Sequence, residues 1–131
     1  EYILDFATLT GAVVITLGHI ATGLMSNNET LVENIKVSSD NTGEHVWQLP
    51  LWDEYCDQVK SDVADVKNLG SPGQAGTIAG AAFLKAFVGK DIPWAHFDVA
   101  GTSYKVENRS YIQKNSASGQ VIRLVLDLLG A

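Results

Sequence analysis

The amino-acid sequence predicts an α/β fold in which a largely parallel sheet is covered by helices. Short apolar runs such as YILDFA and IPWAHFDVA are typical of strands that are buried on both faces. Segments with the apolar spacing of helices alternate with these runs, which is the order found in α/β layers. Each of the two runs also leads into a corner of small residues, ATLTGA and VAGTS. Strand ends of this kind are where α/β proteins place ligands.

The first third of the chain contains two expected strands and two expected helices. They are a strand at residues 2–8, a short helix from Gly11 to Leu17, a strand near 21–26 and a helix at 29–39. In the second helix, Leu31 and Ile35 fall on one face. The turn residues at 40–43 are expected to end it.

The rest of the chain continues the alternation. The expected elements are an extended stretch around Pro50, a helical pattern from Asp53 up to Leu69, a Gly-rich loop at 70–76, a helix that carries Ile78 and Phe87 and stops at Gly89, a strand in IPWAHFDVAGT, a polar loop at 102–118 and a closing helix in GQVIRLVLDLLGA. Only about three strands are expected, which is fewer than such a sheet usually has. We therefore expect the rest of the sheet to lie upstream.

Composition limits the classes of function. The chain has 131 residues, of which 46% are hydrophobic and 18% charged, so one domain or part of one can bury a core. The low charge content favours burial against partner surfaces. The net charge is -6 and the nine Lys and Arg residues are scattered, which argues against binding to nucleic acid or to an anionic membrane.

Two further features point to an ordinary globular segment. Cys56 is the only cysteine, so no intrachain disulfide can form, and its acidic neighbours favour a structural thiol over a nucleophile. The apolar stretch GAVVITLGHIATGLM has 15 residues and contains three glycines, which is too short and too broken to span a bilayer.

The Gly-rich loop GSPGQAG precedes a helix and so invites a phosphate-binding interpretation, because helix N-termini attract anions. However, no lysine follows the last glycine, and the loop comes after a helix rather than a strand. A tight connection into a helix of small residues is the favoured interpretation.

His96 and Asp98 have the i, i+2 spacing that places both side chains on one face of a strand. Such a pair could bind a metal or act as a base with its orienting group, but either role needs a third group, and the sequence offers no obvious one. The favoured interpretation is a hydrogen-bonded histidine, with Asp98 accepting from backbone donors near the strand end. Thr8 and Thr10 also stand at a strand end, without a recognisable base.

The two corners belong to a wider resemblance. The segments DFATLTGAVVITLG, ATGLMSNN, GEHVWQLPLWDEY, KSDVADVKNLG, AGTIAGAAFLKAFV and PWAHFDVAGT together resemble, in order, the C-terminal part of the leucyl aminopeptidase family, the cytosol-type two-metal aminopeptidases. This resemblance implies a three-layer α/β fold with a mostly parallel sheet flanked by helices. It implies that residues 1–131 are the C-terminal segment of a metalloaminopeptidase catalytic domain, without the upstream metal-binding part and the N-terminal domain.

The resemblance implies substrate-binding residues but neither catalytic residues nor metal ligands in this segment. The implied substrate-binding residues are Thr8, Leu9, Gly11, Leu69, Ala100 and Ser103. Ser103 stands where the family often has a more apolar wall residue, which leaves the side-chain preference open. The family's lysine, acidic metal ligands and anion-binding arginine, part of them in its NTDAEGR signature, would all lie upstream.

For the full-length protein, the resemblance implies two divalent metal ions (Mn or Zn), peptide substrates with a free N-terminus, a homo-hexamer and a cytoplasmic location. The isolated segment is then expected to be inactive. Two alternatives stay open at this stage. The chain could be a non-catalytic binding or structural module, or a small free-standing enzyme that uses His96 and Asp98.

Overall fold

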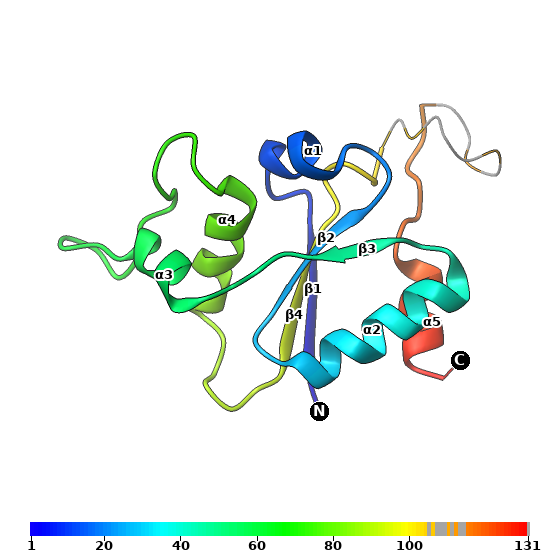
Figure 1. Cartoon of the computed structure of the whole chain (residues 1–131), viewed down its shortest axis with the longest axis horizontal. Coiled ribbons are helices and arrows are strands. Elements are labelled where there is room, and N and C mark those ends of the chain that lie inside the picture. Colours follow the sequence, from blue (N-terminus) through cyan, green and yellow to red (C-terminus); the bar gives the residue numbers. More distant parts are fainter. Residues whose placement is uncertain (105, 107–109, 111, 113–114, 131) are drawn as a thin grey trace.

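Four strands form one mixed sheet in the computed structural model, which describes residues 1–104, 106, 110, 112 and 115–130. The strands are β1 (Ile3–Ala7), β2 (Thr22–Ser26), β3 (Val46–Gln48) and β4 (Trp94–Asp98), and their spatial order is β1-β4-β2-β3 (Figure 1). β1 pairs in parallel with β4, and β2 pairs in parallel with β3. The central pair of β2 and β4 is antiparallel, which the sequence did not indicate.

The helices of the described chain are α1 (Gly11–Leu17), α2 (Glu29–Thr42), α3 (Asp53–Cys56), α4 (Gly76–Lys85) and α5 (Ile122–Leu128), with a 3-10 turn η1 (Asp57–Val59) after α3. α1 has the predicted bounds. α2 runs on to Thr42 and ends at Gly43, which takes the left-handed conformation typical of a helix stop. Thr10 and Asn28 cap the first turns of α1 and α2 through their side chains.

Three helix predictions were too long. The helix that was predicted to stop at Gly89 ends at Lys85. The predicted helix from Asp53 to Leu69 ends after η1, where Lys60 is extended and the Ser61 hydroxyl accepts hydrogen bonds from the amides of Val63 and Ala64. Val63 is 97% exposed, so continuing the helix would bury no apolar face here. The predicted closing helix starts only at Ile122, because Gly119 and Val121 have positive φ.

The expected polar loop at 102–118 is described only in part. Positions 105, 107–109, 111 and 113–114 lie outside the described residues, as does residue 131. At the base of the loop, Tyr104 pairs with Ala117 in an isolated antiparallel bridge.

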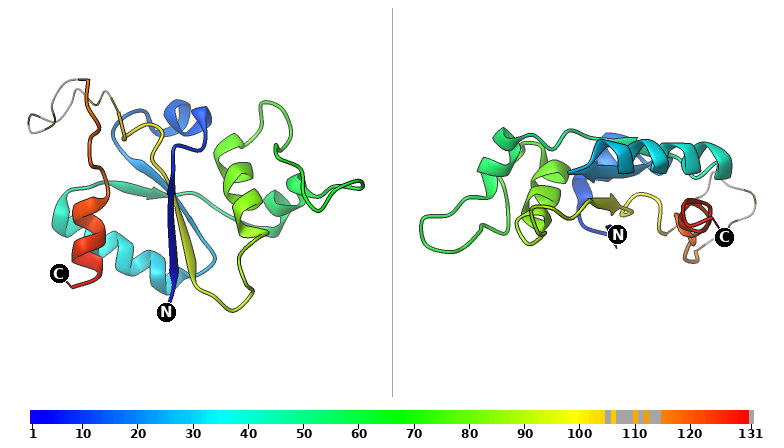
Figure 2. Two further views of the ribbon diagram at one scale, coloured as in Figure 1. Left: turned by 180° about the vertical axis from the view of Figure 1, so that it is seen from behind. Right: turned by 90° about the horizontal axis from the view of Figure 1, so that it is seen from below.

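Helices cover both faces of the sheet, which confirms the predicted three-layer α/β arrangement. α2 and α5 pack on one face, where the core residues are Leu24, Leu31, Val32, Ile35, Ala95, Phe97, Val121 and Leu124. α4 packs on the other face, where Met25, Ala81 and Trp94 form a second cluster. Figures 1 and 2 show α3 with α4 on one side of the strands and α2 with α5 on the other. Among the described residues, no helix is both long and apolar enough to cross a membrane.

Candidate functional site

The carboxyl ends of β1 and β4 lie side by side because the two strands are parallel, and the small-residue corners that follow them therefore meet. We call residues 8–11 the first corner and residues 99–103 the second corner. Asp98, at the end of β4, is fully buried between them. Its Oδ1 atom accepts from the amides of Leu9 (3.2 Å), Thr10 (3.5 Å) and Ala100 (3.2 Å). One buried carboxylate thus holds both corners, as the sequence predicted for its backbone-binding role.

The Thr10 hydroxyl makes a second set of hydrogen bonds that hold the first corner. It donates to Asp98 Oδ2 at 2.7 Å and accepts from the Val13 amide at 3.2 Å, which makes it the N-cap of α1. It also lies 3.2 Å from the Thr77 hydroxyl in the first turn of α4. α4 can approach this closely because residue 80 is a glycine and has no Cβ. A Cβ at Gly80 would lie only 3.0 Å from the side chains of Leu9 and Thr10.

The second corner is held by contacts with β2 and with the turn after α1. The hydroxyls of Thr22 and Thr102, both buried, lie 2.8 Å apart. The Gly101 carbonyl accepts from His19 Nδ1 at 2.6 Å. A Cβ on Gly101 would lie 2.2 Å from the Gly18 carbonyl oxygen, so only glycine fits at this close approach.

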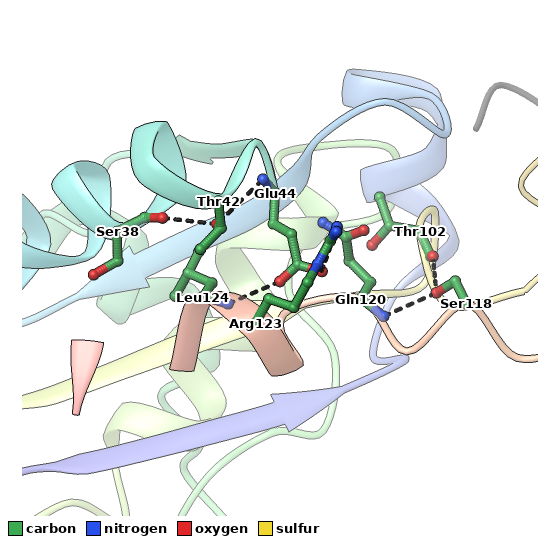
Figure 3. A network of polar contacts seen from close by, with 8 residues as sticks. All are labelled: Ser38, Thr42, Glu44, Thr102, Ser118, Gln120, Arg123 and Leu124. Carbon is green, nitrogen blue, oxygen red and sulfur yellow. Dashed lines mark hydrogen bonds and ion pairs between the residues drawn. The ribbon is translucent and has the colours of Figure 1, made fainter. Parts of the chain in front are cut away.

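A polar network beyond the second corner ties it to α5 (Figure 3). The Ser118 hydroxyl donates to the Thr102 carbonyl at 2.5 Å, and the Ser118 amide donates to the Ser103 carbonyl at 2.9 Å. Closer to α5, the buried carboxylate of Glu44 accepts from the Leu124 amide at 3.0 Å and pairs with Arg123 at 3.3 Å. Glu44 therefore caps the first turn of α5, which has no cap from its own N-terminal residue.

Five of the six substrate-binding residues that the sequence predicted lie in the two corners. Thr8, Leu9 and Gly11 are exposed in the first corner, and Ala100 and Ser103 are half-buried in the second. Leu69 belongs to neither corner: it is 80% exposed in the segment between η1 and α4.

A cavity of about 390 Å³ adjoins the first corner. Its walls come from α1, the loop before α4 and the start of α4, and its lining residues are Ala12, Ile15, Thr16, Leu49, Ser71, Gly73, Gln74, Ala75, Gly76, Thr77 and Ile78. This lining contains no ionisable side chain, and it includes Ala12, which directly follows the first corner. Such a surface can bind and orient an apolar side chain, but it offers no group that transfers a proton.

His96 has a hydrogen-bond partner, Asp5, that was not identified from the sequence. Its Nδ1 atom lies 2.5 Å from Asp5 Oδ1, and Asp5 Oδ2 accepts from Trp94 Nε1 at 2.6 Å. The available signal was the position of Asp5, a lone acidic residue inside an apolar strand. The favoured prediction of a hydrogen-bonded histidine is confirmed, and its acceptor is Asp5.

In the part of the chain that the structure describes, no group of three or more His, Cys, Asp or Glu side chains is arranged to hold a metal ion. These residues therefore do not fit a metal centre. Cys56 is half-buried, and Lys85 Nζ lies 3.6 Å from its sulfur, a cationic neighbour that the local sequence did not reveal.

Comparison with known proteins decides the family. The model of the cytosol aminopeptidase family, catalytic domain, matches residues 1–126. The chain belongs to this family. Probable cytosol aminopeptidases from Geobacter sp. (strain M21) and Protochlamydia amoebophila are 51% and 46% identical to it over 126 and 127 residues, respectively. These matches cover 96% and 97% of the chain and 25% of each relative.

The fold comparison agrees. A mutant of tomato leucine aminopeptidase matches this aminopeptidase-family chain with a TM-score of 0.88 and 37% identity, covering 98% of the chain and 24% of the tomato protein. The chain therefore spans about a quarter of the length of the family members that it matches. The family resemblance stated from the sequence is confirmed, and the fold is that of the corresponding quarter of a leucine aminopeptidase.

Proposed function

We propose that this chain is the C-terminal segment of the catalytic domain of a leucyl-type metalloaminopeptidase, which removes N-terminal residues from peptides. The observation that carries the proposal is the family match over residues 1–126, which includes both corners joined by Asp98. In this function the segment provides walls of the substrate site and the scaffold behind them. The parent protein supplies the catalytic groups.

The six substrate-binding residues would have distinct roles. Thr8, Gly11 and Ala100 line the pocket for the first side chain, where their small size leaves room for a leucine-like group. Leu9 donates its amide hydrogen to Asp98, so it would contact a peptide through its carbonyl and its 36%-exposed side chain. Ser103 would form a more polar part of the first pocket wall, and Leu69 would line the second-residue pocket. The exposure of Thr8, Leu9, Gly11 and Leu69 is consistent with these roles.

The two divalent ions, Mn or Zn, would be held by residues upstream of this segment. Bound there, they would supply Lewis-acid activation of the peptide carbonyl and of water. The residues of this segment would orient the peptide main chain and enclose its first side chain, which favours reaction by fixing the geometry.

The parent protein is proposed to work in the cytoplasm as a homo-hexamer. Two features are consistent with an assembly. Charged residues are only 18% of the chain, and several large apolar side chains lie exposed, including Ile15, Trp47, Trp52 and Phe87. Such side chains are candidates for burial against the rest of the protein or against other subunits.

The test compares the 131-residue chain with the full-length protein that contains it, using leucine p-nitroanilide and added Mn²⁺ or Zn²⁺. We expect hydrolysis by the full-length protein, none by the segment alone, and recovery when the separately expressed upstream part is combined with the segment. Undiminished hydrolysis by the segment alone, lost in a His96→Ala variant, would refute the proposal and favour a free-standing enzyme. Tight binding of DNA at low salt without hydrolysis would favour a binding module.

A further inference from the structure

The β1–β4 pair contains a second carboxylate contact, on the same face of the sheet as Asp98. Asp5, in the middle of β1, accepts from two side chains of β4, Trp94 and His96, at 2.6 and 2.5 Å. Both donors are buried, with 1% and 0% exposure, whereas the Asp5 side chain is 32% exposed. Because a carboxylate only accepts hydrogen bonds, His96 donates from Nδ1, which fixes the orientation of its ring.

The other ring nitrogen of His96 has no competing hydrogen bond in the part of the chain that the structure describes. Nε2 is buried without a hydrogen-bond partner among the described residues. The ring stacks on Trp94 with a centroid distance of 6.4 Å and an interplanar angle of 15°. The polar interaction of His96 is therefore directed through Nδ1 to β1.

Asp5 and Asp98 both link β1 to β4, but they belong to different strands. Asp5 lies on β1 and takes its donors from β4, whereas Asp98 lies on β4 and takes donors from the residues that follow β1. In the strand register, Asp5 is opposite His96 and Ala7 is opposite Asp98. β1 is thus fixed to β4 by side chains at its middle and just beyond its end, and this opposes a slip in register, which would exchange the faces of β1.

We propose that His96 is a positioning residue for the substrate pocket: through its hydrogen bond to Asp5, it fixes where β1 ends along β4. The first corner begins directly after β1, and Thr8 is only three positions beyond Asp5. The position of β1 along β4 therefore sets the separation of Thr8 and Gly11 from Ala100. This inference rests on the proposed function, because it assigns the surface formed by the two corners to the first side chain of the peptide.

Two substitutions of His96 by amide side chains test which ring nitrogen is required, using enzyme kinetics on the full-length protein. In His96→Asn the amide nitrogen occupies the place of Nδ1 and can still donate to Asp5, whereas in His96→Gln it reaches toward the place of Nε2. We expect KM for leucine p-nitroanilide to rise about tenfold in the Gln variant, the loss of one hydrogen bond to a charged acceptor, with a much smaller change in kcat. The Asn variant is expected to stay near the wild type.

Asp5→Asn provides a second variant that keeps the size of the side chain, in case His96→Gln does not fold. Its amide oxygen can accept from only one of the two β4 donors, so KM is expected to rise here too. The same Asn and Gln replacements at the exposed His45 are the matched controls and should leave KM unchanged. Equal KM values for the two His96 variants, or an unchanged KM in Asp5→Asn, would overturn the proposal.

A spectroscopic readout keeps this inference separate from the proposed function. Solid-state ¹⁵N spectra of the histidine-labelled protein, with His96→Asn used to assign the signal, should show Nδ1 of His96 protonated and hydrogen-bonded. A non-protonated Nδ1 would overturn the positioning role. Absence of aminopeptidase activity in the wild type would refute the proposed function, while the spectrum would still test the bond to Asp5.

Discussion

The hydroxyl of Thr10 donates to Asp98 Oδ2 at 2.7 Å across 88 positions of sequence. The same carboxylate accepts from the amides of Leu9 in the first corner and Ala100 in the second. The two ends of the candidate site are therefore joined through one buried side chain.

Asp98→Asn should weaken both stability and substrate binding. The amide keeps one acceptor oxygen, but its NH₂ group would face donors that now lack an acceptor. We expect the free energy of unfolding to fall by about 1–3 kcal/mol, and KM for leucine p-nitroanilide to rise. Denaturant unfolding and steady-state kinetics of the full-length protein measure the two effects. Asp91→Asn, at an exposed position, is the control, and equal behaviour of the two variants would contradict the role of Asp98.

Thr10→Val removes the hydroxyl that caps α1 and binds Asp98 while keeping the shape of the side chain. A loss of about 1–2 kcal/mol of stability is expected from the missing cap and hydrogen bond. Thr10→Ser retains the hydroxyl and should lose much less. Thermal unfolding compares the two, with the exposed Thr30→Val as reference. A Val variant as stable as the wild type, together with a destabilised Ser variant, would mean that the methyl group, not the hydroxyl, matters.

Gly101→Ala is expected to lower stability, whereas Gly11→Ala is expected to alter substrate binding. A Cβ at Gly101 would lie 2.2 Å from the Gly18 carbonyl, so the turn after α1 or the second corner must move. We expect a clear loss of stability for this variant. A Cβ at Gly11 meets nothing within 4 Å, and alanine favours the helix that starts there. Gly11→Ala should therefore leave the free energy of unfolding unchanged. It should alter KM, because the added methyl group narrows the proposed pocket.

Glu44→Gln should loosen the start of α5. The buried carboxylate caps the Leu124 amide and pairs with Arg123, so we expect a loss of about 1–3 kcal/mol. Amide hydrogen exchange should become faster at Leu124 than in the wild type. Glu33→Gln removes an exposed ion pair with Lys36 and should change stability by less than about 1 kcal/mol. Similar losses in the two variants would argue against the capping role.

The family, the alternation of strands and helices, and the positions of both corners were all predictable from the sequence alone. The sequence also predicted α1 and the roles of Asp98 and His96 as hydrogen-bonding groups. These predictions succeeded because they depend on local patterns: apolar runs, turn residues and small residues at strand ends. The same patterns predicted too long a helix after Asp53, because they did not show that the Val63 side chain is exposed and packs in no core.

Which side chains contact one another became known from the three-dimensional structure. The antiparallel pairing of β2 with β4, the Asp5 acceptor of His96, the bond from Thr10 to Asp98 and the place of Lys85 beside Cys56 join residues that are distant in the chain. A carboxylate in a sequence shows that it can accept hydrogen bonds, but not from which donors. The donors are set by the packing of one strand against another, which no local segment contains.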